Sequence, residues 1–155
     1  MTSITWNVND KSTLLNVDLN KLEVNYTGRG EDNDAVIRTN NPIPLQCKLF
    51  YFEIDITNDG KNEDEEDEED GIIAIGFCTK LAELNKLPGC GKNSWGYHSD
   101  DGNFFDCSEL EEPYGSTFKT SDTIGCCLNF RNNTVLYTKN GVNLGREIAK
   151  YRNRI

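Results

Sequence analysis

The feature that most constrains the fold is a stretch in which apolar and polar residues alternate one by one, over residues 49–57. Its apolar members fall on one side and its polar members on the other: Phe50, Phe52, Ile54 and Ile56 against Glu53, Asp55 and Thr57. Successive side chains of a β-strand point to opposite faces, so a period of two is typical of a strand with one buried face. The stretch therefore predicts a half-buried strand and not a helix.

Similar short apolar runs, separated by turn residues, continue along the chain. Further strands are predicted over 13–17, 21–26, 35–38, 72–78, 123–130 and 134–138. Asn140-Gly141 predicts a tight type I′ hairpin, because both residues tolerate positive φ angles. The one helical candidate is residues 80–86, which stop before Pro88-Gly89. Many short strands in a chain of 155 residues predict one all-β domain, an antiparallel two-sheet β-sandwich with a short helix near 80–86.

An unbroken acidic run occupies residues 63–70, between two of the predicted strands. The net charge is −10, and without these eight acidic residues it becomes −2. Like charges at this density repel and do not bury, so residues 58–71 are expected to form a disordered hairpin loop. Three interpretations of this loop follow: a solvated insertion with no role, a decoy for basic partners, or a calcium sponge. The nearly neutral remainder indicates no basic surface for nucleic acid.

The cysteines are interpreted through the compartment that the sequence favours. No stretch approaches the ~20 apolar residues that a membrane span requires. Residues 1–7 show neither a basic nor an apolar region of the secretory type. We therefore expect a cytoplasmic or nuclear location, where the six cysteines are free thiols and not disulfides.

The sequence offers no constellation for catalysis or for a cofactor. His98 is the only histidine, and a lone histidine is more often structural than catalytic. Cys126 and Cys127 are adjacent in a predicted strand, so they point to opposite faces and cannot share one metal ion. We expect no enzyme activity, no metal, no cofactor and no small-molecule substrate. One alternative is a lectin-like or glycan-cleaving sandwich, for which the carboxylates would be Asp100, Asp101 and Asp106.

Seven segments of the chain carry a family likeness: 35–44 (AVIRTNNPIP), 51–54 (YFEI), 75–77 (IGF), 87–102 (LPGCGKNSWGYHSDDG), 114–118 (YGSTF), 122–129 (DTIGCCLN) and 137–141 (YTKNG). Together they resemble the SPRY domain family, and within it the branch of Ran-binding protein M, over about residues 6–145. Most of these positions also have a folding explanation. Tyr97 is expected to be a buried strand residue, and Asp100-Asp101-Gly102 a turn.

The resemblance implies a concanavalin A-like jelly-roll sandwich that binds a short peptide segment of a partner protein through loops at one end. By position, the implied wall residues are Arg38, Thr39, Asn40, Asn41, Leu87, Pro88, Gly89, Lys92, Asn93, Trp95, Tyr114 and Gly115, with Ser116 a further contributor. The planar guanidinium of Arg38 would bind carbonyls or carboxylates. Trp95 and Tyr114 would offer aromatic contact area, with burial in the core as the alternative for Trp95.

The same resemblance implies that Arg38→Ala weakens a peptide partner by roughly 1–3 kcal/mol and leaves folding intact. It also implies a monomeric adaptor or scaffold domain of the kind found in ubiquitin-ligase assemblies.

The chain departs from the family pattern after Gly145. Family members continue with strands that complete the sandwich, whereas residues 146–155 form a divergent basic tail. The domain is therefore assigned to residues 1–145. Three alternatives follow for the tail: it substitutes for the missing strands, a partner strand fills the gap, or the domain is a truncated relative that does not bind.

Overall fold

The computed structural model describes residues 3–28, 34–60, 71–107 and 111–145. Within these ranges the chain forms twelve strands and no helix. The strands are β1 (Trp6–Lys11), β2 (Leu15–Val17), β3 (Val24–Tyr26), β4 (Ile37–Thr39), β5 (Leu49–Asp55), β6 (Ala74–Cys78), β7 (Ser94–His98), β8 (Asn103–Phe105), β9 (Glu111–Pro113), β10 (Thr123–Asn129), β11 (Thr134–Lys139) and β12 (Val142–Asn143).

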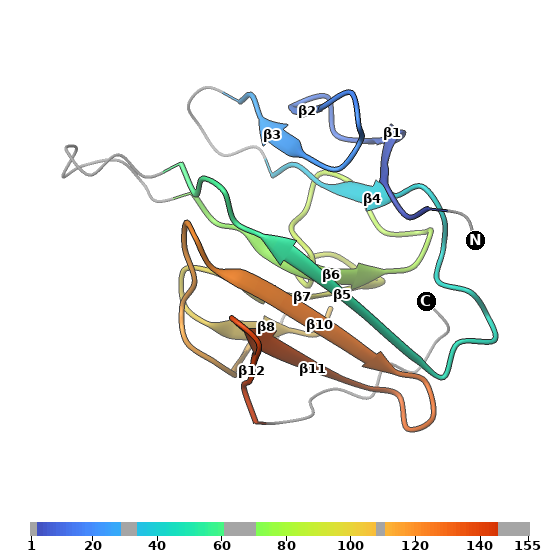
Figure 1. The fold of residues 1–155 in the computed structure, drawn as a ribbon, viewed down its shortest axis with the longest axis vertical. Coiled ribbons are helices and arrows are strands. Elements are labelled where there is room, and N and C mark those ends of the chain that lie inside the picture. Colours follow the sequence, from blue (N-terminus) through green and yellow to red (C-terminus); the bar gives the residue numbers. More distant parts are fainter. Residues whose placement is uncertain (1–2, 29–33, 61–70, 108–110, 146–155) are drawn as a thin grey trace, which may run out of the picture.

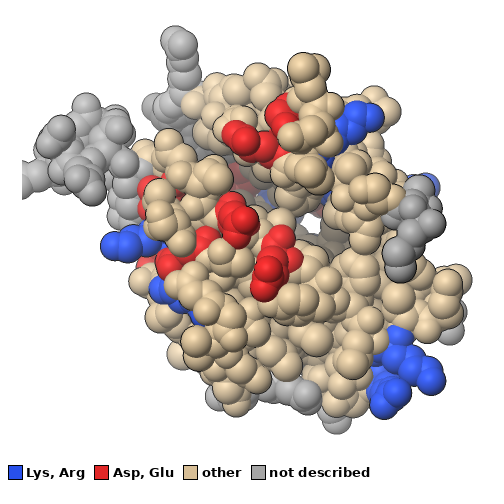
Figure 2. Space-filling model, viewed as in Figure 1, with Lys and Arg blue, Asp and Glu red and all other residues tan. Residues whose placement is uncertain are grey.

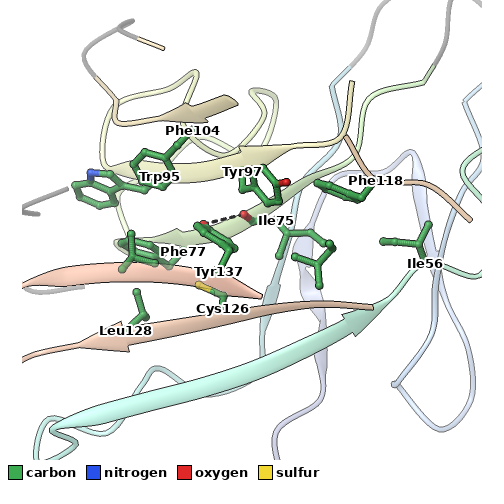
Figure 3. Close-up of a cluster of buried hydrophobic side chains, with 12 residues drawn as sticks. Ile56, Ile75, Phe77, Trp95, Tyr97, Phe104, Phe118, Cys126, Leu128 and Tyr137 are labelled. Carbon is green, nitrogen blue, oxygen red and sulfur yellow. Dashed lines mark hydrogen bonds between the residues drawn. The ribbon is translucent and has the colours of Figure 1, made fainter. Parts of the chain in front are cut away.

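Two four-stranded antiparallel sheets form the body of the domain, with the strand orders β12-β11-β10-β5 and β6-β7-β8-β9. Two smaller pairs, β1-β4 and β2-β3, lie beside them at the top of Figure 1. The two larger sheets enclose the apolar core between them (Figure 3). The predicted all-β fold with two antiparallel sheets is therefore confirmed.

Strand β5 has the alternation that the sequence predicted. Its apolar side chains Phe50 and Phe52 are partly buried against the core, whereas Tyr51 and Glu53 on the other face are exposed. Seven residue pairs align β5 with β10. The side-chain period of two thus places the phenylalanines on the same inner face as the buried residues of β10.

A hydrogen bond between buried groups joins the two layers of the sandwich. The hydroxyl of Tyr137 on β11 donates to the carbonyl oxygen of Ile75 on β6 at 3.0 Å, drawn as a dashed line in Figure 3. The rings of Tyr137 and Tyr97 are both fully buried, with centroids 5.1 Å apart. Burial raises the pKa of Tyr97 to about 12, and it raises the pKa of Tyr137 well above its ordinary value. Both hydroxyls therefore remain protonated donors at neutral pH.

We expect Tyr137→Phe to lower the free energy of unfolding by about 1–2 kcal/mol, because it removes a donor from a buried carbonyl. Tyr26→Phe is the control, since Tyr26 is 54% exposed and its substitution should change stability by less than about 0.5 kcal/mol. Urea unfolding followed by tryptophan fluorescence measures both. An equal, small effect of the two substitutions would show that the interlayer hydrogen bond is unimportant.

Two turns have the backbone conformation that their residues predict. Asn140 and Gly141 have φ angles of 52° and 77°, as a type I′ hairpin between β11 and β12 requires. Gly102 ends the turn after β7 with a φ angle of 71°, and the Asp101 carboxylate accepts a hydrogen bond from the Asn103 N–H at 2.8 Å. Both features follow from local chemistry, which is why the sequence alone predicts them.

The helix predicted over residues 80–86 is wrong: these residues form turns and irregular backbone. The segment instead lies along β4, where the carbonyl oxygen of Leu84 accepts a hydrogen bond from the Val36 N–H at 3.2 Å. The carbonyl oxygen of Lys80 accepts another from Arg38 at 3.0 Å. An isolated helix of two turns is marginal in water, so these tertiary bonds to the backbone decide its conformation.

The six cysteines are free thiols. Cys126 is fully buried and its neighbour Cys127 is only partly buried, which agrees with their predicted placement on opposite faces of β10. Burial raises the pKa of the Cys126 thiol far above its ordinary value, so this residue is an unreactive part of the core. Most of the predicted acidic loop and the whole divergent tail, residues 61–70 and 146–155, lie outside the described residues.

Candidate protein-interaction surface

The Leu-Pro-Gly segment, residues 87–89, covers the outer face of strand β7. The Ser94 hydroxyl on that face accepts a hydrogen bond from the Gly89 N–H at 3.0 Å and donates one to the Gly91 carbonyl oxygen at 2.8 Å. Gly89 has a φ angle of +93°, and its carbonyl oxygen accepts a bond from the Cys107 N–H at 3.2 Å. Two glycines and a serine thus fix the path of the segment.

Gly96 and His98 complete this contact farther along β7. A β-carbon on Gly96 would lie 2.3 Å from the carbonyl oxygen of Pro88, so only glycine fits beneath the segment. The Nε2–H of His98 donates to the same oxygen at 2.8 Å, and the His98 ring stacks on Phe105 with centroids 4.0 Å apart. His98 is 2% exposed, which gives the single histidine the structural role expected from the sequence. Pro88 and Gly89 are therefore held by the fold, with their backbones turned toward β7.

The guanidinium of Arg38 is occupied within the domain. Its Nε and Nη2 atoms each donate to the Asp10 carboxylate at 2.8 Å, a two-bond pair that joins β4 to β1. Its Nη1 atom donates to the carbonyl oxygens of Thr79 and Lys80 at 3.2 and 3.0 Å. The bond to Arg38 lowers the pKa of Asp10, so the pair stays charged at neutral pH. Arg38 therefore anchors the segment that follows β6, and its side chain is only 18% exposed.

The residues after Arg38 divide between structural and exposed roles. Asn40 accepts a hydrogen bond from the Thr5 N–H at 3.0 Å and donates one to the Ser3 carbonyl oxygen at 3.2 Å, so it holds the N-terminal residues. Thr39 is exposed, and its hydroxyl donates to the carbonyl oxygen of the partly buried Asn41 at 2.9 Å. Thr39 and Asn40 are both exposed, but the Asn40 amide is bonded to the N-terminal residues.

Both aromatic residues of the predicted wall contribute to the core. Trp95 is 6% exposed and stacks on Phe77 with ring centroids 5.3 Å apart. The hydroxyl of the partly buried Tyr114 accepts a hydrogen bond from the Tyr137 N–H at 2.9 Å. These contacts favour the packing role that the sequence left open for Trp95, and they assign a similar one to Tyr114.

The predicted wall residues lie at two different ends of the sandwich. The Asn93 carbonyl oxygen accepts a hydrogen bond from the Thr79 N–H at 2.9 Å, which places Asn93 beside the residues that Arg38 binds. Gly115 instead donates to the Gly102 carbonyl oxygen at 2.9 Å, beyond the opposite end of β7. The five residues of β7 span about 13 Å at the rise of an extended strand. Tyr114 and Gly115 are therefore separated from the Arg38 and Asn93 end.

At the Arg38 end, four exposed residues form what we call the rim surface: Thr39, Lys80, Leu81 and Lys92. Thr79 joins the three chain segments to which these residues belong. Its N–H donates to the Asn93 carbonyl oxygen, and its own carbonyl oxygen accepts from Arg38. The side chain of Leu81 is 80% exposed. Lys80 and Leu81 are absent from the predicted wall, because the family resemblance assigned the wall to other positions. The sequence signal for an exposed loop here is a leucine next to a lysine, in a segment too short to form a stable helix.

Charged groups are separated on the face shown in Figure 2, where acidic side chains gather near the middle and basic side chains lie toward the periphery. Nucleic-acid binding requires clustered basic groups, and this face does not present them. Among the described residues, no group of three or more histidine, cysteine or acidic side chains is placed to hold a metal ion. The Asp101 carboxylate stabilises the turn in which it lies, because it accepts the hydrogen bond from the Asn103 N–H.

The described part of the chain contains no helix that would be long and apolar enough to span a membrane.

A family model described as the SPRY domain matches residues 49–154 of the chain. The chain belongs to the SPRY domain family. SPRY domains are protein-interaction modules, and the sequence resemblance to this family is thereby confirmed. The fold agrees as well: a crystal structure of a human SPRY domain superposes with a TM-score of 0.63 at 22% identity, covering 88% of this chain and 81% of that one.

Similar curated proteins include Ran-binding proteins, as the SPRY motifs indicated. A Ran-binding proteins 9/10 homolog of Drosophila melanogaster is 45% identical over 142 residues, which is 90% of this chain and 14% of that protein. Human Ran-binding protein 9 is 42% identical over 90% of this chain and 18% of its own length. A Ran-binding protein M homolog of Arabidopsis thaliana is 34% identical over 90% of this chain and 28% of its length. The chain thus spans less than a third of these relatives.

Proposed function

We propose that this SPRY domain binds a short peptide segment of a partner protein at the rim surface. The observation that carries the proposal is the anchoring of two chain segments to one arginine. Arg38 fixes the Thr79 and Lys80 carbonyls, while Thr39 and Leu81 stand exposed on either side of those bonds. Rigid strands that hold exposed loop residues are a common arrangement for recognition, because the loops lose little conformational entropy on binding.

The chemistry of the rim surface favours a peptide with an apolar anchor near acidic groups. Leu81 offers apolar area, and the two lysines of the rim surface offer positive charge within an acidic chain of net charge −10. Of the wall residues that resemblance to the family implies, Thr39 and Lys92 belong to this surface, and Asn41 is hydrogen-bonded to Thr39. Arg38 and Asn93 hold the segments at this end through their bonds to Thr79 and Lys80, whereas Tyr114 and Gly115 lie at the other end of β7.

We expect Leu81→Asp to weaken peptide binding without lowering the melting temperature, because the side chain is 80% exposed and its replacement adds a repulsive charge. Peptides selected from a random library on the wild-type domain provide the probe, and fluorescence anisotropy measures their affinity. Affinity should fall by at least about tenfold, which corresponds to the loss of one moderate interface contact.

Leu19→Asp provides the matched control, because Leu19 is also fully exposed but belongs to the turn between β2 and β3. It should leave affinity unchanged. Equal loss in both variants, or retained affinity in Leu81→Asp, would reject the rim surface. A library that yields no binding peptide, together with binding on a glycan array, would favour the lectin-like alternative instead.

We also propose that the domain acts as an adaptor or scaffold in the cytoplasm or nucleus. Six free thiols fit a reducing compartment, where disulfides rarely persist. The relatives that match are several times longer than this chain, so in those proteins the matching region is one part of a longer polypeptide, as an adaptor or scaffold arrangement would require. Membership in a ubiquitin-ligase assembly is part of this proposal and is tested by affinity purification under native conditions.

A further inference from the structure

The turn between β11 and β12 is held by the side chain of Asn140 as well as by the backbone. The Asn140 Nδ2 atom donates to the Asp122 carboxylate at 2.9 Å, and its Oδ1 atom accepts from the Thr123 N–H at 2.8 Å. The Asn140 N–H donates to the Thr123 carbonyl oxygen at 2.8 Å. Both ends of the amide are thus fixed by the residues at the start of β10.

The carboxylate that holds this amide is itself well defined. Asp122 also accepts a hydrogen bond from the Lys119 N–H at 2.9 Å and pairs with the Lys139 ammonium at 3.4 Å. Burial raises the pKa of Asp122, but its bonds to Asn140, Lys119 and Lys139 together lower it below its ordinary value. Asp122 therefore remains a charged acceptor for the Asn140 amide at neutral pH.

An asparagine followed by glycine is chemically labile, and Asn140-Gly141 is the one such pair in the sequence. The backbone nitrogen of Gly141 attacks Cγ of Asn140, a C–N bond forms, and the Cγ–Nδ2 bond breaks. Ammonia leaves with the proton that the Gly141 amide loses. Water then opens the cyclic imide at either carbonyl, giving aspartate or isoaspartate. Glycine permits the attack because it has no β-carbon to hinder the nitrogen.

We propose that Asn140 is a deamidation site whose reaction the fold controls through Asp122 and Thr123. In the closed hairpin, Cγ cannot turn toward the Gly141 nitrogen without breaking both side-chain hydrogen bonds. The surroundings do not protect it sterically. Asn140 and Gly141 are exposed, and among the described residues, apart from Gly141 and its two chain neighbours, no heavy atom lies within 4 Å of the place a β-carbon on Gly141 would take. Asn140 is protected from deamidation by the hydrogen bonds of its side chain to Asp122 and Thr123, which we call the clamp.

The product of the reaction weakens the same hairpin. An aspartate at position 140 replaces the donor nitrogen with a carboxylate oxygen, which faces the Asp122 carboxylate where a 2.9 Å hydrogen bond was. Two carboxylates at that distance repel, and isoaspartate further adds a carbon to the backbone of a two-residue turn. Deamidation is therefore an irreversible change that adds one negative charge and loosens the β10–β11–β12 edge of the sheet.

The test measures isoaspartate and aspartate at position 140 by peptide mapping after incubation of the folded domain in neutral buffer. We expect Asp122→Ala to deamidate roughly tenfold faster than wild type, as the loss of a hydrogen bond to a charged group implies. The wild-type chain in urea gives the unclamped rate, so the comparison holds even if Asp122→Ala folds poorly. Asp122→Asn keeps an acceptor oxygen and should stay near the wild-type rate.

Lys139→Ala separates the clamp from general loosening of the turn. It removes the ion pair with Asp122 and a 2.7 Å bond to the Thr117 carbonyl oxygen, but it leaves both bonds of the Asn140 amide in place. It should deamidate at the wild-type rate. Equal rates in folded wild type and in urea would overturn the proposal. So would an acceleration in Lys139→Ala as large as that in Asp122→Ala.

Discussion

Replacing Arg38 with alanine should lower the free energy of unfolding by about 3 kcal/mol, because the substitution leaves a carboxylate and two carbonyls without their charged donor. The donor joins β4 to β1 through Asp10 and to the backbone of Thr79 and Lys80. The effect combines a bidentate ion pair with two further hydrogen bonds. Urea unfolding measures it directly, and the melting temperature should fall by several degrees.

Arg131→Ala is the control for Arg38→Ala. Arg131 is exposed in the turn between β10 and β11, and it should contribute less than about 0.5 kcal/mol. Arg38→Lys should recover only part of the loss, because an ammonium does not reproduce the planar two-bond contact with Asp10. Unchanged stability in Arg38→Ala would mean that the guanidinium is available to a partner, as the family resemblance alone suggests. We expect any loss of peptide affinity in Arg38→Ala to come from displacement of the segment that carries Leu81.

Gly96→Ala should also lower the free energy of unfolding by about 3 kcal/mol. Its β-carbon would meet the Pro88 carbonyl oxygen at 2.3 Å and the Pro88 carbonyl carbon at 2.8 Å. These are backbone atoms of a segment fixed by Ser94 and His98, so relief requires the Leu-Pro-Gly segment to lift from β7. Amide hydrogen exchange should then show reduced protection at residues 87–91, while β10 and β11 remain protected.

Gly71→Ala is the matched control for Gly96→Ala. Among the described residues outside its immediate chain neighbours, the nearest atom to a β-carbon there would be the Asp59 carbonyl oxygen at 3.5 Å, which is an ordinary contact. Stability should change by less than about 0.5 kcal/mol. If Gly96→Ala is equally mild and its residues 87–91 stay protected, the cover over β7 is not the structural unit that the contacts indicate.

Local patterns predict much of this fold because their causes are local. The alternation of Phe50 to Glu53 reflects the geometry of one strand, and Asn140-Gly141 reflects the backbone freedom of two residues. The sequence does not predict strand β9, because Glu111–Pro113 contains no apolar alternation. Only the pairing of these residues with β8 makes them a strand. Segment 80–86 was assigned wrongly for the same reason, since bonds to β4 decide its backbone.

The site was harder to predict than the fold, because its key contacts join residues far apart in the sequence. Nothing near Arg38 indicates that Asp10, 28 positions away, uses its guanidinium. The motif of residues 87–98 is part of the resemblance to the family. Within it, Ser94, Gly96 and His98 hold the loop that contains Pro88 and Gly89 against β7. Leu81 carries no motif, and we propose a role for it only because its side chain is exposed.

The most direct test is an NMR titration of the isotopically labelled domain with a selected peptide. The proposed function predicts that shift changes are largest at the amides of Thr39, Lys80, Leu81 and Lys92, with smaller changes at neighbouring positions of the same end. Changes concentrated instead around Gly102, Tyr114 and Gly115, at the other end of β7, would contradict it.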